Sequence, residues 1–325
     1  MALRRNSGII SFFRRYVMKN FIILPDSTCD ISKEAMADIG MTDYLRGHVN
    51  YNGVEFPTTL DWTCFSREEY YKTLSNKKAK VTTAPPSPAE YVEKFESLVK
   101  AGLDVICICL SSKISATWNF ATSAAEEVKA KYPEAKIYCF DSFRMSGGIG
   151  LLTYYAFKLQ NEGKSFDEVV AWLEENKTKV HQMGPIDDLI FIARRGRISM
   201  GKAIMGSFAG VKPMGDCNAD GYTSVITKAK GIGKAFDITV EYVKATATDI
   251  ENQYLFVVHS DRELYANTLK EKLQALNPKH IYVSDVHSAC GANIGPGMIG
   301  VYYLGETISE DMSREKEIIS KIVGK

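Results

Sequence analysis

Four short hydroxyl-rich segments are the part of the sequence best suited to chemistry. We expect each to lie just after a strand, and together they are residues 26–28, 82–83, 111–117 and 141–142. The carboxyl ends of parallel strands share one edge of a sheet, and ligands bind in the crevice at that edge. Ser115 also precedes a predicted helix, whose free backbone N–H groups bind anions. A single hydroxyl in this position is an ordinary helix cap, whereas four such segments at one edge favour a binding site.

The motifs of several enzyme classes do not occur in the sequence. Because GxSxG is missing, no nucleophile elbow supports Ser115 as a catalytic serine. A serine hydrolase or acyltransferase that uses Ser115 with a base supplied by the fold stays open as the alternative function. HExxH and CxxC are also missing, and the glycines at 147, 148 and 150 lack the GxGxxG spacing. We therefore predict no catalytic residue, no metal and no cofactor.

Residues 196–202 match the GxxxxGK pattern of a phosphate-binding loop. However, Ala203 stands where the pattern has the Ser or Thr whose hydroxyl holds Mg²⁺. The same stretch carries the four cations Arg194, Arg195, Arg197 and Lys202. A positive cluster of this kind suits a phosphate or an acidic partner, and it is equally compatible with a solvated loop.

Composition indicates a soluble globular protein. The 325 residues are 45% apolar and 24% charged, and no apolar run approaches the roughly 18 residues of a membrane span. The net charge of +1 hides an uneven distribution, because the first twenty residues carry five basic side chains and no acid. The rest of the chain is slightly acidic, which argues against a nucleic-acid surface. With no secretory signal and no disulfide spacing, we expect a cytoplasmic protein.

The basic leader, residues 1–17, has three interpretations. It is a basic arm for an anionic membrane surface, an unstructured tail, or an extension upstream of a working start at Met18.

Apolar runs and amphipathic segments alternate along the first half of the chain. This alternation is typical of βαβ units on a parallel sheet. We predict strands over 21–24, 105–110 and 137–140 and helices over 88–100, 119–132, 148–161 and 166–179. Glycines interrupt the chain after residue 180, and the α/β pattern then resumes with helices over 234–246 and 262–276 and strands over 254–259, 281–286 and 298–303. The sequence thus predicts two α/β domains, residues 18–180 with a parallel sheet and residues 181–325.

Taken in order, the motifs resemble those of the DegV family of bacterial fatty-acid-binding proteins. The similar segments are DST at 26–28, TAPPSP at 83–88, SSKISATW at 111–118, DS at 141–142, GRI at 196–198 and GPG at 295–297. The chain departs from the family pattern at Ala84 and Pro85, where Ser and Gln are usual, and at Ala116 and Trp118, where Gly and Tyr are usual. Asn293 stands where the family has His.

The resemblance implies a lipid carrier and not an enzyme. A long-chain fatty acid would lie between the two domains, with its carboxylate held by Thr83, Ser115, the backbone amide of Ala116 and Asn293. It also implies a partner, a separate fatty acid kinase that phosphorylates the presented carboxylate, with Arg197 contacting the kinase or its phosphate. Nucleic acid is not an expected partner, and contact with a membrane surface would be at most transient.

Overall fold

The computed structural model describes residues 21–76, 79–198 and 210–324. The leader with its three interpretations, and Lys202 and Ala203 of the GxxxxGK segment, lie outside these ranges.

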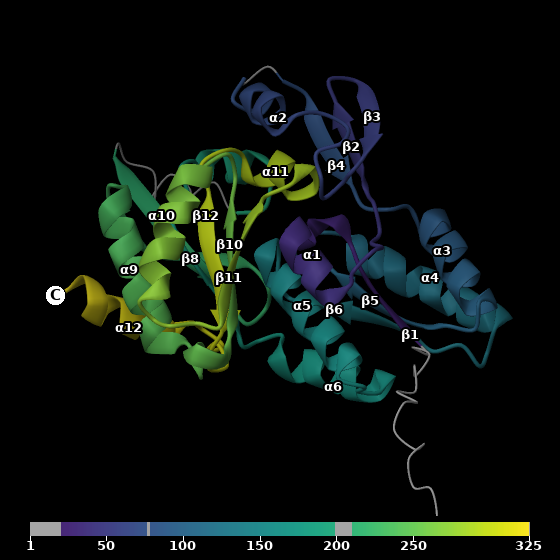
Figure 1. Cartoon of the computed structure of the whole chain (residues 1–325). Helices are drawn as coiled ribbons and strands as arrows, with labels where there is room; N and C mark the ends of the chain where they lie inside the picture. Colours follow the sequence, from purple (N-terminus) through teal and green to yellow (C-terminus); the bar gives the residue numbers. More distant parts are fainter. Residues whose placement is uncertain (1–20, 77–78, 199–209, 325) are drawn as a thin grey trace, which may run out of the picture.

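The first half of the chain folds around a three-stranded parallel sheet (Figure 1). Its strand order is β1 (Phe21–Pro25), β5 (Asp104–Cys109) and β6 (Ile137–Asp141). Alternate residues of each strand point to opposite faces, so Val105 and Cys107 pack on one helical layer and Ile106 and Ile108 on the other. The first layer is α3 (Pro88–Lys100) and α4 (Thr117–Lys131), and the second is α1 (Lys33–Ile39), α5 (Gly147–Asn161) and α6 (Phe166–Asn176). The parallel sheet predicted for this half is confirmed.

An antiparallel insertion, residues 48–84, interrupts this pattern between α1 and α3, and we call it the inset. It contains a sheet of order β3-β2-β4 and one helix. Its elements are β2 (His48–Tyr51), β3 (Val54–Pro57), α2 (Arg67–Leu74) and β4 (Val81–Ala84). Sequence analysis did not predict them, because strands of four residues that are mostly part-exposed carry no clear apolar run.

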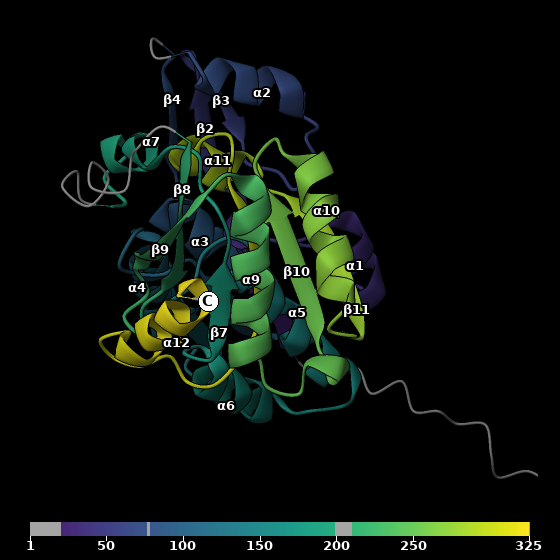
Figure 2. The same cartoon turned by 90° about the vertical axis from the view of Figure 1, so that its left-hand side faces the viewer.

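The second half forms a four-stranded mixed sheet. The order is β11 (His280–Asp285), β10 (Tyr254–His259), β12 (Ile299–Leu304) and β7 (Val180–Met183), and β12 runs antiparallel to both of its neighbours. Helices α9 (Ile232–Thr246) and α10 (Glu263–Gln274) cover its outer face (Figure 2), with α12 (Ser313–Val323) beside α9. The remaining elements are α7 (Leu189–Arg194), the hairpin β8 (Val211–Cys217) and β9 (Thr223–Lys230), and α11 (Ser288–Ile294).

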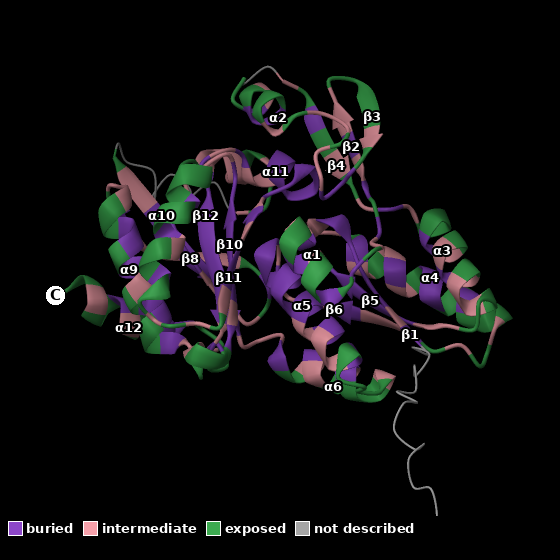
Figure 3. Ribbon diagram, in the orientation of Figure 1, coloured by how far each residue is buried: buried purple, intermediate pink, exposed green. Residues whose placement is uncertain are grey.

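Helix α5 lies between the two sheets and is buried along most of its length (Figure 3). Its apolar side chains share one core with Ile106 of the first sheet and with Phe256 and Tyr302 of the second. The glycines of α5 allow this close packing, because a Cβ on Gly150 would lie 2.5 Å from the Cys29 carbonyl oxygen. The α/β fold class is therefore confirmed, while the domain boundary at residue 180 stays a prediction, since this core is continuous across it.

A search for a bilayer-spanning helix across the described ranges finds none of sufficient length and apolarity.

Candidate functional site

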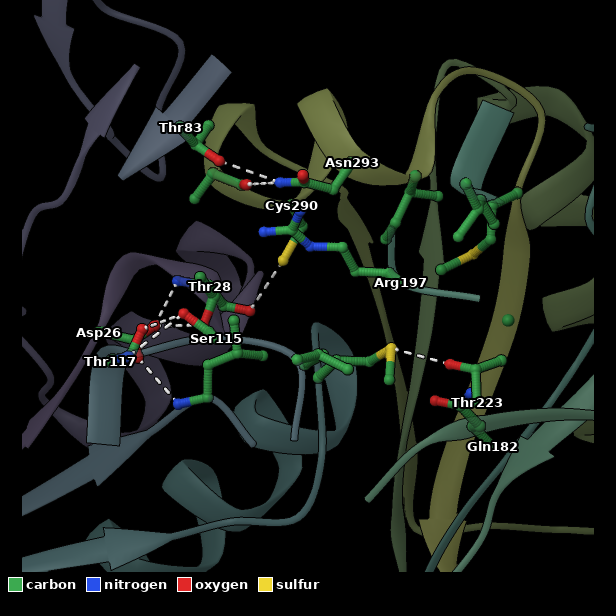
Figure 4. Close-up of a pocket in the computed structure, with 18 of the residues that line it drawn as sticks. Asp26, Thr28, Thr83, Ser115, Thr117, Gln182, Arg197, Thr223, Cys290 and Asn293 are labelled. Atoms are coloured by element: carbon green, nitrogen blue, oxygen red, sulfur yellow. Dashed lines mark hydrogen bonds between the residues drawn. The ribbon is translucent and has the colours of Figure 1, made fainter. Parts of the chain in front are cut away.

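One deep pocket opens where the first sheet ends, between the inset, α11 and the second sheet (Figure 4). Together with its open mouth it holds about 1280 Å³ of space free of protein atoms. Most of the surface of its wall is apolar. Its larger aliphatic and thioether side chains come from both halves of the chain and are Leu110, Ile114, Met145, Met183, Ile186, Leu189, Ile192, Ile198, Ile294, Met298 and Ile299. The wall therefore suits an apolar ligand.

Asp26 fixes the turn that follows β1. It is 2% exposed, and its carboxylate accepts hydrogen bonds from the Thr28 backbone N–H at 2.7 Å, the Leu110 N–H at 3.0 Å and the Thr28 hydroxyl. Burial raises the pKa of Asp26 above its usual value, against the lowering effect of these hydrogen bonds. Asp26, Ser27 and Thr28 all line the pocket. The hydroxyl-rich segment at 26–28 thus lies at the predicted sheet edge.

Ser115 and Thr117 lie at the start of α4, one on each side of the N-cap residue Ala116. Their hydroxyl oxygens are 2.7 Å apart, and the Thr117 backbone N–H donates to Ser115 Oγ at 3.3 Å. Both residues line the pocket. Ala116 is exposed and does not, so the expected role of its amide stays a prediction. The helix start therefore offers hydroxyl groups to a ligand.

Thr83 and Asn293 come together although they are 210 positions apart. Thr83 lies on β4 of the inset and Asn293 on α11, and Asn293 Nδ2 donates to Thr83 Oγ1 at 3.0 Å and to the Ala289 carbonyl at 3.3 Å. These two bonds use both amide protons of Asn293. The hydroxyl of Thr83 accepts from Asn293 and keeps its own proton for another acceptor.

Arg197 also lines the pocket, where sequence analysis expected only a contact with a partner. Its guanidinium points from the α7 side toward Cys290 and Asn293 (Figure 4). The residue is exposed at the mouth, and partial burial together with the neighbouring Arg195 lowers its pKa from the usual value. A cation thus stands at the same end of the pocket as the hydroxyls. We call Thr83, Ser115, Arg197 and Asn293 the polar end.

The inset is held on the second half of the chain by aromatic donors. Trp62 Nε1 donates to Asp285 Oδ2 at 2.9 Å, and the Tyr71 hydroxyl donates to the Val286 carbonyl at 2.5 Å. Tyr70 donates similarly to the Ser288 carbonyl at 2.9 Å. These contacts fix the inset against the start of α11, and therefore fix Thr83 beside Asn293.

The surroundings of Ser115 bear on the hydrolase alternative. Within the described ranges, the side-chain hydrogen bonds of Ser115 are to Thr117, and none is to a histidine or a carboxylate. The same ranges contain no group of three or more His, Cys, Asp or Glu side chains arranged to hold a metal ion. Among the described residues, no histidine or carboxylate is therefore hydrogen-bonded to Ser115 as the base of a nucleophilic serine would be.

Five lining residues that carry polar or thiol groups were not predicted from the sequence, namely Thr58, Gln182, Thr223, Cys290 and Tyr302. Gln182, Thr223 and Cys290 lie on β7, β9 and α11, and no local pattern in the sequence directs these side chains into the pocket.

Fold and site together define an α/β protein with a pocket that has an apolar wall and polar groups collected at one end. A sequence model of the DegV family, described as uncharacterised, matches residues 20–306, and the chain belongs to that family. A DegV domain-containing protein of Clostridium perfringens is 33% identical over 291 residues, which cover 89% of this chain and 99% of that protein.

Solved structures show the same fold. DegV of Bacillus subtilis, described as a fatty acid binding protein, is 27% identical with a TM-score of 0.74, covering 88% of this chain and 99% of that one. A DegV family protein of Ruminococcus gnavus, solved with vaccenic acid, has a TM-score of 0.78 at 20% identity, covering 87% and 99%. The fatty acid kinase (Fak) B3 protein of Streptococcus pneumoniae, loaded with linoleic acid, has a TM-score of 0.75 at 19% identity, covering 87% and 99%.

Proposed function

We propose that this protein binds a long-chain fatty acid in the pocket, with the carboxylate at the polar end and the acyl chain along the apolar wall. The observation that carries the proposal is the convergence of hydroxyl groups from β4 and from the start of α4 with the guanidinium of Arg197, at one end of an otherwise apolar pocket. The fatty acids named with the related structures support it.

The head group is recognised by hydrogen bonds and one charge. Thr83 and Ser115 donate their hydroxyl protons to the carboxylate, and Arg197 adds a positive charge at the mouth. Hydrogen bonds to a charged group contribute roughly 1.5–3 kcal/mol each, which offsets the loss of hydration of the carboxylate. The Ala116 amide is a further donor in this proposal, where the helix dipole favours an anion.

Asn293 acts through Thr83 in this scheme. Because both of its amide protons are already used, Asn293 orients the Thr83 hydroxyl so that the Thr83 proton points to the ligand. Asn293 is therefore a positioning residue.

The acyl chain supplies most of the affinity. At about 0.8 kcal/mol per methylene, roughly 14 buried methylenes offer at most about 11 kcal/mol before the entropy of binding reduces it.

We further propose that the protein presents the bound carboxylate to a separate fatty acid kinase. The likeness to the kinase B3 protein supports this step, as does the position of Arg197, exposed at the mouth where a partner could reach it. In this role the protein is a carrier, and the kinase performs the phosphoryl transfer.

Mass spectrometry of the purified protein under native conditions tests the carrier function. We expect a noncovalent mass equal to a fatty acid, which is lost on denaturation. A covalent acyl adduct on Ser115 would support the hydrolase alternative, and a protein that neither carries nor takes up fatty acid would refute the proposal.

Displacement of a fluorescent fatty acid then tests the polar end. Ser115→Ala and Thr83→Ala should each weaken binding by roughly 1.5–3 kcal/mol, because each removes one donor to a buried carboxylate. Ser112→Ala and Thr82→Ala are matched controls, since both residues lie beside the site and outside the pocket lining. Equal affinities in all four variants would contradict the assignment of the polar end.

A further inference from the structure

Two polar side chains line the pocket on the side away from Asp26 and Ser115. They are Gln182 on β7 and Thr223 at the start of β9 (Figure 4). We call this pair the distal pair. An unsubstituted acyl chain has no use for hydrogen-bonding groups at this depth, so the pair requires a separate explanation.

Gln182 brings an unused acceptor. Its Oε1 is buried, and no described residue donates to it. Burying an acceptor without a partner is unfavourable, so such atoms are rare in folded proteins. The orphan oxygen therefore indicates that a donor belongs at this point of the pocket.

The backbone of Gln182 is held in place by a buried network. Its N–H donates to Asp216 Oδ1 at 2.8 Å, and Asp216 is fully buried. The other carboxylate oxygen, Asp216 Oδ2, is 2.8 Å from His181 Nδ1 and accepts from the Tyr242 hydroxyl at 3.2 Å. This buried network fixes β7 against β8 directly behind the pocket.

Thr223 brings a poorly used donor. Its hydroxyl donates to Met145 Sδ at 3.2 Å. A thioether sulfur is a weak acceptor, so a hydroxyl oxygen would replace it favourably. The distal pair thus offers one acceptor without a donor and one donor with a weak acceptor, a combination that a single hydroxyl group satisfies.

We propose that the preferred ligand is a fatty acid that carries a hydroxyl group on the part of its chain remote from the carboxylate. That hydroxyl donates its proton to Gln182 Oε1 and accepts from Thr223 Oγ1. The proposal rests on the fatty-acid function proposed above and adds the substrate class. A plain chain leaves Oε1 unsatisfied, or leaves an ordered water beside it within the pocket.

The test compares stearic acid with hydroxystearic acids that carry the hydroxyl at mid-chain or near the methyl end, by displacement of a fluorescent fatty acid from the full chain. We expect at least one hydroxylated isomer to bind at least about tenfold more tightly than stearic acid, since sites built to bond a hydroxyl reject analogues that lack it. If stearic acid binds as tightly as every hydroxylated isomer, the proposal is wrong, and a retained water satisfies Gln182.

Variants locate the effect. Gln182→Leu and Thr223→Val should each reduce the preference for the hydroxylated acid to within about threefold, and stearic acid should bind to Gln182→Leu at least as tightly as to the parent. Thr227→Val is the matched control, because Thr227 lies on the same strand, outside this pocket, and should keep the full preference.

A preference that survives both distal substitutions would overturn the assignment of the hydroxyl to this pair. Failure of the carrier function gives a different result, because then neither acid displaces the probe from any form of the protein.

Discussion

The two halves of the molecule meet at two interfaces of opposite character. At α5 the contact is an apolar core in which glycines let helix and sheet approach closely. At the inset, side chains donate hydrogen bonds to carbonyl and carboxylate groups that lie just before α11 or at its first residue. Close packing at α5 leaves no room for added volume, whereas the inset interface adds directional hydrogen bonds to an aromatic cluster that packs on Ala292 of α11.

The pocket lies between these two interfaces. Because the interfaces differ in their contacts, they have different roles. Helix α5 holds the sheets together, and the inset interface places Thr83 beside Asn293. Substitutions at α5 should therefore lower stability, whereas substitutions at the inset interface should lower both stability and ligand affinity. The following predictions test that separation.

Gly150→Ala should cause the largest loss of stability. Its Cβ would lie 2.5 Å from the Cys29 carbonyl oxygen, and a backbone atom cannot move aside as a flexible side chain can. We expect a decrease of about 2–3 kcal/mol in the free energy of unfolding, measured by urea denaturation. Gly233→Ala is the matched control in α9, where nothing lies within 4 Å of the added Cβ. It should be neutral or stabilising by up to about 1 kcal/mol, and equal losses in both variants would contradict close packing at α5.

Tyr71→Phe should weaken the inset interface. It removes the donor to the buried Val286 carbonyl, for an expected cost of about 1–2 kcal/mol in the free energy of unfolding. Fatty-acid affinity should also fall several-fold, because α11 then holds Asn293 less firmly beside Thr83. Tyr265→Phe, at an exposed position, should change neither quantity. If Tyr71→Phe lowered stability and left affinity unchanged, the inset interface would not position the site.

Asn293→His should make fatty-acid affinity depend on pH. An imidazole gains a proton near its ordinary pKa of about 6.5, and the charge then attracts the carboxylate, whereas the amide of Asn293 does not titrate. We expect the variant to bind more tightly at about pH 6 than at about pH 8, by a larger ratio than the parent. Isothermal titration across this range measures both ratios. If affinity changed with pH in the same way in parent and variant, position 293 would not interact with the carboxylate of the ligand.

His259 should give the inset interface a small pH dependence. It is almost fully buried, with Nε2 at 3.5 Å from the Asp285 carboxylate, and burial lowers its pKa below the usual value. The folded state therefore binds fewer protons than the unfolded state, and stability falls as pH drops from about 6.5 toward the folded pKa. In His259→Asn, an oxygen replaces the Nδ1 that accepts from the Arg262 N–H. This variant should lose less stability over that window, as denaturation at several pH values will measure.

The elements that sequence analysis found are those with long local patterns. Helix α3 was predicted with its observed bounds, because its apolar face repeats with helical spacing. In the structure, Ser87 and Glu90 form a capping box at its start. The strands β1, β5 and β6 were found through their apolar runs. The antiparallel direction of β12 was not foreseen, since direction depends on long-range pairing and an apolar run does not reveal it.

The site was predicted only in part, because local patterns can be read from the sequence and long-range packing cannot. Ser115 and the turn at 26–28 follow strands, so the sheet edge could be inferred from order along the chain. The pairing of Thr83 with Asn293 depended on the family resemblance, because no local rule joins positions 210 apart. Arg197 was assigned to a partner and lies in the pocket lining, and the distal pair had no signal at all. These positions depend on how the second half packs against the first.

The long-range docking of the inset has a consequence for synthesis on the ribosome. Chains fold as they emerge, N-terminal parts first, and β1, β5 and β6 are complete once residue 141 is available. The acceptors for Trp62, Tyr70 and Tyr71 lie at positions 285–288. Until those positions emerge, the aromatic side chains of the inset lack their hydrogen-bond acceptors, and Thr83 lacks its contact with Asn293. A nascent chain therefore cannot form the complete pocket before α11 has emerged.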